Sequence, residues 1–139
     1  MHHRHVLAAA IALLLMTMGA PAGPRLLDDA VKHEITAKDL KLKLDKGEKV
    51  IIIDARSSLN GQIIKGALHI PSDKLNDWAK EADKQAVIVT YCTCPHDEAA
   101  EGEVETLQGM GFKNALSLKG GLNAAREAGI PIVPPAAEQ

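Results

Sequence analysis

Two cysteines separated by one threonine, Cys92 and Cys94, are the residues of this sequence best suited to covalent chemistry. A thiolate is a strong nucleophile, and two neighbouring thiols can also exchange with a disulfide. They open the polar segment 92–99, which reads Cys-Thr-Cys-Pro-His-Asp-Glu-Ala. The chain holds no other cysteine, so any thiol chemistry depends on this pair, and a spacing of two residues is expected to strain a disulfide between them.

The elements on either side of this segment are expected to place it at one edge of a parallel sheet. Residues 86–91, Ala-Val-Ile-Val-Thr-Tyr, form the strongest predicted strand and end directly before Cys92. After the segment, Ala100, Val104 and Leu107 recur at helical spacing and predict a helix. Ligands of open parallel sheets bind beyond the carboxyl ends of the strands, so the thiols lie where a ligand site is expected.

The rest of the chain alternates between predicted strands and helices, which is typical of an α/β domain with a parallel sheet. Residues 50–53 are continuously apolar and β-branched, as in a strand buried on both faces. Thr36 and Ser72 are the predicted N-caps of two helices. The other predicted elements are strands at 66–70 and 114–118 and a helix at 122–128. Because there are only three aromatic residues, the core must be built from Ile, Val, Leu and Ala.

The N-terminus has the layout of a secretory signal peptide, with a basic start, an apolar run at 6–18 and the small pair Ala20 and Ala22. The apolar run is short for a bilayer core of about 30 Å, so we expect cleavage after Ala22 rather than an uncleaved anchor. The predicted organisation is a signal peptide at 1–22, a flexible arm at 23–34, one domain at 35–133 and a tail at 134–139. We expect a periplasmic or secreted protein, free of the membrane after cleavage, in a compartment where cysteines tend to pair.

The charge balance argues against a nucleic-acid partner, because the formal net charge is −2 and Arg4 would be lost with the signal peptide. The expected partners are small molecules, and we expect a monomer. The sequence shows no internal repeat.

Four segments, in order and at characteristic spacing, carry a family resemblance that spans about residues 35–133. They are Ile-Ile-Ile-Asp-Ala-Arg at 51–56, Lys-Gly-Ala-Leu-His-Ile-Pro at 65–71, the strand ending in Tyr-Cys at 91–92, and the C-terminal stretch 111–131 with its Gly-Phe and Leu-Lys-Gly-Gly motifs. Together they resemble the rhodanese family of sulfurtransferases.

The resemblance implies a rhodanese-like three-layer α/β fold, with a small parallel sheet of about five strands flanked by helices on both faces. It also implies a nucleophilic cysteine that opens a loop whose backbone N–H groups surround the transferred sulfur. Such a thiol lies at a helix N-terminus, where the macrodipole and amide donors favour a thiolate and its persulfide. A small sulfur donor and a thiophilic acceptor, such as cyanide or another thiol, are the expected partners. No metal or organic cofactor is required.

The sequence departs from the family pattern in places that bear on activity. Gln62 and Ile63 stand where the family has Gly-His, and Ala125 stands where Trp is frequent. The segment 92–98 is about two residues longer than the usual loop and lacks the Arg or Lys that closes it. Its Cys-x-Cys-Pro pattern resembles that of a subset of rhodanese-like domains. An arsenate reductase or phosphatase is not expected, because those oxyanions need the missing cation.

The insertion leaves two candidates for the nucleophile. Counting forward from the strand selects Cys92, whereas counting back from Gly111 and Phe112 selects Cys94, which we favour because it keeps the usual distance to the helix. Cys92 would otherwise be a buried residue that finishes a strand, and Pro95 weighs against Cys94 by removing one N–H donor.

Other residues are expected to support the cysteines. The predicted substrate-binding loop consists of Thr93, Pro95, His96, Asp97, Glu98 and Ala99. Within it, His96 either tunes a thiolate or is a plain exposed side chain, and the two acids favour the start of a helix. Asp54 and Arg56 are expected to form an ion pair that steadies the floor of the loop.

Three alternatives to a sulfurtransferase remain at this point. The cysteines could form a dithiol that only exchanges electrons, or, with His96, they could bind copper(I) or zinc. The domain could also be a catalytically silent interaction module, as the missing loop cation allows.

Overall fold

A computed structural model describes residues 33–135 of the chain. The predicted signal peptide at 1–22, most of the predicted arm and the last four residues of the tail lie outside the described residues. Within residues 33–135, no helix is long and apolar enough to cross a membrane.

The centre of the fold is a parallel sheet of five strands in the order β1-β6-β5-β2-β4. The three inner strands are β6 (Ala115–Leu118), β5 (Val87–Tyr91) and β2 (Val50–Asp54). The edges are the two-residue strands β1 (Glu34–Ile35) and β4 (Leu68–His69). Each inner strand coincides with one of the strands predicted from the sequence. The predicted α/β fold with a small parallel sheet is confirmed.

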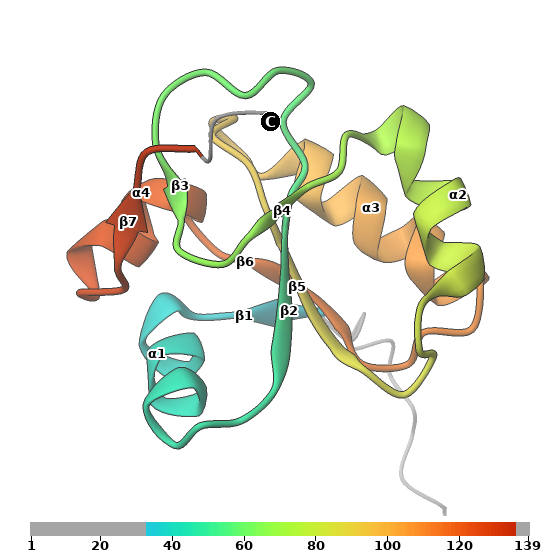
Figure 1. Cartoon of the computed structure of the whole chain (residues 1–139), viewed down its shortest axis with the longest axis horizontal. Coiled ribbons are helices and arrows are strands. Elements are labelled where there is room, and N and C mark those ends of the chain that lie inside the picture. The colour runs from blue at the N-terminus through green and yellow to red at the C-terminus, as the bar shows by residue number, and fades with distance from the viewer. Residues whose placement is uncertain (1–32, 136–139) are drawn as a thin grey trace, which may run out of the picture. The chain divides into compact units, whose positions relative to one another are not determined.

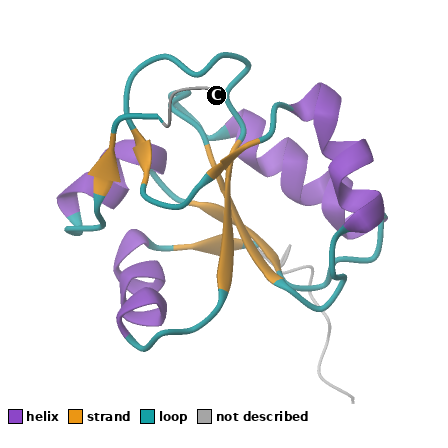
Figure 2. Cartoon of the chain, in the orientation of Figure 1, coloured by secondary structure: helices purple, strands orange, loops and turns teal. Residues whose placement is uncertain are grey.

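Helices cover both faces of this sheet, as Figure 1 shows. On one face lie α1 (Ala37–Asp45) and α4 (Gly121–Glu127), and on the other lie α2 (Ser72–Glu81) and α3 (Glu98–Gly109). Figure 2 shows the same layers by type of element. Neighbouring strand residues alternate between the two cores: Ile52 and Val89 pack with α1 and α4, and Ile53 and Ile88 pack with α2 and α3.

Two of the predicted helix starts can be compared with the structure directly. Thr36 is the N-cap of α1, and its hydroxyl accepts a hydrogen bond from the backbone N–H of Asp39 at 3.1 Å. Ser72 is the first residue of α2 rather than its cap, because Pro71 holds the N-cap position with an extended backbone. The pattern placed both helix starts correctly to within one residue.

A second, antiparallel sheet joins β3 (Ile63–Ile64) to β7 (Ile132–Val133). The sequence did not predict this sheet, because a strand of two residues carries no alternation that could be recognised. Ile63, which marks a departure from the family pattern, is buried in it.

Candidate functional site

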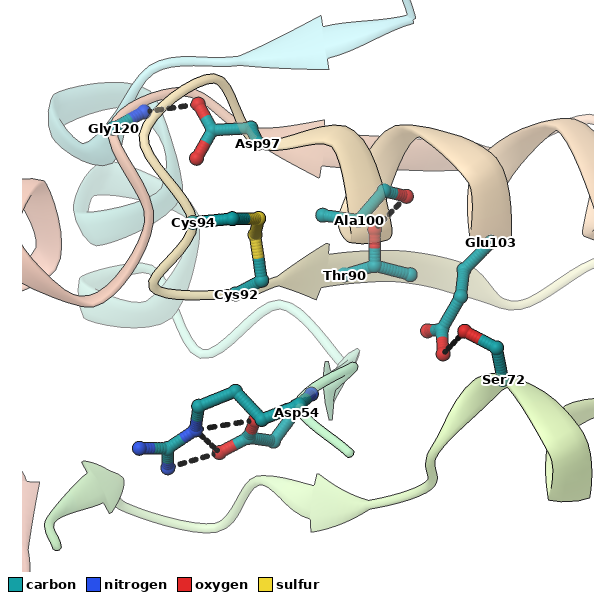
Figure 3. Close-up of a disulfide and its surroundings, with 10 residues drawn as sticks. Asp54, Ser72, Thr90, Cys92, Cys94, Asp97, Ala100, Glu103 and Gly120 are labelled. Carbon is teal, nitrogen blue, oxygen red and sulfur yellow. Dashed lines mark hydrogen bonds and ion pairs between the residues drawn. A yellow bond between two sulfur atoms is a disulfide. The ribbon is translucent and has the colours of Figure 1, made fainter. Parts of the chain in front are cut away.

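The segment between β5 and α3 holds Cys92 and Cys94 as a disulfide, drawn in Figure 3. Their Cα atoms lie 5.7 Å apart, within the usual range for bonded cysteines, so the backbone accommodates the short spacing that we expected to cause strain. Cys92 is 2% exposed and packs with Ala55 and Ala100, whereas Cys94 is only partly buried. In this form the protein holds no free thiol, so thiolate chemistry requires reduction first.

A pocket of about 580 Å³ lies beside the disulfide, at the carboxyl ends of β2 and β5. Its walls come from the segment after β2, the start of α2 and residues 92–97 between β5 and α3, which we call the cysteine loop. The lining residues are Ala55, Arg56, Ser57, Ser58, Asn60, Pro71, Ser72, Asp73, Cys92, Thr93, Cys94 and Ala99. The site therefore lies at the edge of the sheet at which ligands of open parallel sheets are expected.

The predicted loop residues divide between the pocket and its outside. Thr93 and Ala99 line the pocket, and Pro95, His96, Asp97 and Glu98 do not belong to its lining. His96 is exposed and lies outside the pocket lining. Asp97 is the N-cap of α3 and Glu98 its first residue, so the prediction that these acids start a helix is confirmed.

Asp97 also ties the cysteine loop to the start of α4, which the sequence did not predict. Its carboxylate accepts a hydrogen bond from the backbone N–H of Gly120 at 2.8 Å, and the N–H of Leu122 donates to the carbonyl of Cys92 at 3.3 Å. Gly121 has a φ of +52°, and a Cβ added there would collide with that carbonyl oxygen. The Gly-Gly pair is thus the sequence signal for close approach of two backbones.

Asp54 and Arg56 form the ion pair that was expected, at the end of β2. The Arg56 Nε donates to Asp54 Oδ1 at 2.8 Å, and Nη2 donates to Asp54 Oδ2. Nη1 donates to the carbonyl of Asn60 at 2.8 Å, and Nη2 also donates to that of Gln62 at 3.0 Å. The hydrogen bond to Asp54 raises the pKa of Arg56 above its ordinary value. Arg56 therefore shapes the wall of the pocket, and its charge is already paired.

Tyr91 completes this network and was missed by the sequence analysis. Its hydroxyl donates to Asp54 Oδ2 at 2.8 Å and accepts from the backbone N–H of Ile64 at 3.1 Å. Burial raises the pKa of Tyr91 above its ordinary value, so the hydroxyl stays protonated. The signal that could have found it was a single tyrosine at the end of the strongest strand.

Glu103 is a second residue that the sequence analysis missed. It is 1% exposed, and its Oε1 accepts a hydrogen bond from the Ser72 hydroxyl at 3.3 Å, whereas its Oε2 has no hydrogen-bond partner. Burial raises the pKa of Glu103 from its ordinary value of 4.5 to about 7. Its position on the same helix face as Ala100, Val104 and Leu107 was the available signal.

The sequence also allowed Cys92, Cys94 and His96 as ligands of copper(I) or zinc. Across residues 33–135, no group of three or more His, Cys, Asp or Glu side chains is arranged to hold a metal ion. The two sulfur atoms are bonded to each other instead.

Comparisons with known proteins identify the family of this chain. Residues 36–128 match the family model of the rhodanese-like domain. The chain is 32% identical over 81 residues to the thiosulfate sulfurtransferase GlpE of Coxiella burnetii. The aligned residues cover 57% of this chain and 74% of that relative. It is 29% identical over 87 residues to the thiosulfate sulfurtransferase GlpE of Pseudomonas putida, and the aligned residues cover 61% of this chain and 77% of that relative.

Solved structures show the same fold. The Alr3790 protein of Anabaena sp. superposes with a TM-score of 0.64 at 31% identity, which covers 74% of this chain and 94% of that one. The BH2092 protein of Bacillus halodurans superposes with a TM-score of 0.65 at 28% identity, which covers 75% and 78%.

Proposed function

The chain belongs to the family of rhodanese-like domains, and from this premise we propose that it is a sulfurtransferase that works through a persulfide on Cys94. The single observation that carries the assignment of the nucleophile is the difference between the two cysteines. Both cysteines line the pocket of about 580 Å³, but Cys94 is partly exposed whereas Cys92 is only 2% exposed. A donor that enters the pocket therefore meets Cys94 first once the disulfide is reduced.

The chemistry needs only groups that surround the pocket. The Cys94 thiolate attacks the outer sulfur of thiosulfate, the sulfur–sulfur bond breaks, and sulfite leaves with the electron pair. A thiophilic acceptor, cyanide or a thiolate, then attacks the outer sulfur of the persulfide and restores the Cys94 thiolate. The side chains of Ser57, Ser58 and Thr93 in the pocket lining carry hydroxyl groups that can donate to an anionic donor, and the cation Arg56 is paired with Asp54.

The intact mass of the reduced protein after exposure to thiosulfate or polysulfide tests this proposal. We expect a single added sulfur, about 32 Da, that persists on Cys92→Ser and is present on the wild type early after exposure, and no added sulfur on Cys94→Ser. Loading that survives in Cys94→Ser and disappears in Cys92→Ser would reverse the assignment. If no form takes up sulfur from either donor, the domain is a silent module or a redox protein and the proposal fails.

A second candidate function, an electron-exchanging dithiol, is favoured by the disulfide itself. Such a protein would show a measurable disulfide potential in exchange with thiol buffers but would not load sulfur. The mass measurement therefore separates the two candidates.

We also propose that the mature protein is a periplasmic or secreted monomer. The support for export is the N-terminal sequence pattern at 1–22, together with a disulfide that an oxidising compartment would tolerate. Detection of a cleaved form in a periplasmic extract would test it.

A further inference from the structure

Besides the disulfide, Cys92 and Cys94 are each fixed by a backbone hydrogen bond in which no sulfur atom takes part. The carbonyl of Cys92 accepts from the N–H of Leu122 at 3.3 Å, and the carbonyl of Cys94 accepts from the N–H of Asp97 at 3.4 Å. Asp97 is in turn bound to the N–H of Gly120 at 2.8 Å. Both cysteines are therefore anchored to the residues that begin α4.

The anchors have a consequence for the reduced protein. Reduction breaks only the bond between the two sulfur atoms, which take no part in these hydrogen bonds, so we expect the two thiols to stay close together. Cys92 is 2% exposed and packed against Ala55 and Ala100, so a bulky external reagent reaches it less easily than it reaches Cys94. The neighbour best placed to react with Cys92 is the sulfur of Cys94.

We propose that Cys92 is a built-in acceptor that resolves a persulfide on Cys94 and releases sulfide, leaving the Cys92–Cys94 disulfide that the structure contains. This inference rests on the proposed function, because it begins from a Cys94 persulfide. It adds a second activity to the same pocket: reductive release of sulfide rather than transfer of sulfur to an external acceptor.

The step balances in atoms and electrons. The Cys92 thiolate attacks the Sγ of Cys94, the bond from that Sγ to the outer sulfur breaks, and the outer sulfur leaves as hydrosulfide. The sulfane sulfur is reduced, and the two cysteines are oxidised to the disulfide. An external dithiol then reduces the disulfide by exchange and starts another cycle. With thiosulfate as donor, each cycle consumes one thiosulfate and one dithiol and yields one sulfite, one sulfide and one oxidised dithiol.

Proximity makes the internal acceptor competitive with external ones. Groups held in contact react as if at an effective concentration far above that of any solute, on the order of 10⁵–10⁸ M in well-oriented cases. We therefore expect the wild-type persulfide to decay without added acceptor and the Cys92→Ser persulfide to persist.

A single-turnover experiment tests the inference. Full-length protein is reduced with dithiothreitol, desalted without oxygen and mixed with one equivalent of thiosulfate in the absence of cyanide or free thiol. Released sulfide and intact mass are then followed over time. We expect the wild type to release close to one equivalent of sulfide and to end 2 Da lighter than its reduced form. Cys92→Ser should keep the 32 Da adduct and release at least ten-fold less sulfide in the same time.

The outcomes separate this inference from the proposed function. If both the wild type and Cys92→Ser keep the adduct with equal sulfide release, the inference is wrong while the sulfurtransferase proposal stands. If neither form gains sulfur or releases sulfide, the proposed function itself fails. Lys119→Ala, which changes an exposed side chain outside the pocket, controls for handling and should behave as the wild type.

Discussion

Cys92 and Cys94 lie in different surroundings although only Thr93 separates them. Cys92 directly follows β5, so its side chain continues the buried pattern of the strand and lies under α3. Cys94 lies in the loop beyond, where the chain has left the sheet and borders the pocket. The two cysteines differ in exposure because β5 ends between the buried pattern of the strand and the loop. We therefore propose the more exposed Cys94 as the nucleophile and the buried Cys92 as the internal acceptor.

Tyr91→Phe is the substitution that tests the network beneath the pocket. It removes the hydroxyl that links Asp54 to the N–H of Ile64 and leaves that buried N–H without its partner. A buried donor left unpaired costs about 1–3 kcal/mol, so we expect the free energy of unfolding to fall by that amount. Urea denaturation measures it. An unchanged midpoint and slope would show that the hydroxyl contributes nothing to stability.

Among the elements, the start of α4 has the most direct control over the cysteine loop. Gly121→Ala introduces a Cβ that collides with the carbonyl oxygen of Cys92, at a φ that side chains rarely adopt. The left-handed backbone alone costs about 1–2 kcal/mol, and the collision must add to it by moving the loop. We expect lower stability by urea denaturation together with slower sulfur loading by intact mass.

Gly102→Ala is the matched control, because Gly102 lies within α3 and an added Cβ there meets nothing within 4 Å. Alanine in the middle of a helix is more stable than glycine by about 0.5–1 kcal/mol, so this variant should gain stability and load sulfur normally. Equal behaviour of the two variants would contradict the role given to the start of α4.

The elements also show how far the sequence could be used alone. The sequence placed β2 and β5 correctly, because strands buried on both faces leave a continuous apolar run. It placed α3 correctly, because a helix buried along one stripe leaves apolar residues at helical spacing. The pairing of β3 with β7 could not be predicted, because two strands of two residues far apart in the chain carry no such pattern. The family resemblance supplied the order of motifs. The hydrogen bond from the Gly120 N–H to the Asp97 carboxylate joins segments far apart in the chain and could not be predicted from them.

At the scale of the whole molecule, the buried carboxyl of Glu103 links stability to pH. Its pKa is about 7 in the folded protein and near 4.5 when exposed, so the folded state binds the proton more tightly. Its contribution to stability is therefore complete below about pH 4.5 and is lost as the pH rises through 7. Each pKa unit corresponds to about 1.4 kcal/mol, which gives roughly 3 kcal/mol at most.

Glu103→Gln tests this linkage, because glutamine stays neutral at every pH. We expect the variant to gain stability relative to the wild type between pH 5 and pH 8, by up to roughly 3 kcal/mol in urea denaturation. Glu101→Gln, on the exposed face of the same helix, is the control and should leave the pH dependence of the wild type unchanged. A constant difference between Glu103→Gln and the wild type at both pH values would contradict the assignment.

The candidate site, like the fold, was only partly accessible from the sequence. Both cysteines, the ion pair of Asp54 with Arg56 and the helix start at Asp97 came from motifs and spacing. Tyr91, Ser72 and Glu103 did not, because their importance arises from partners that the fold brings from distant parts of the chain: Ile64 and Asp54 for Tyr91, and α3 for Ser72. Such partnerships leave no trace in local periodicity.

Cys94, in the lining of the pocket at the carboxyl ends of β2 and β5, is the residue that we propose takes up one sulfur atom. The most direct measurement is the intact mass of the reduced Cys92→Ser variant within the first minutes after thiosulfate is added, because this form cannot close the disulfide. Our account predicts one added sulfur, localised to Cys94 by peptide mapping. A variant that keeps its reduced mass, or a sulfur found anywhere other than Cys94, would contradict the account.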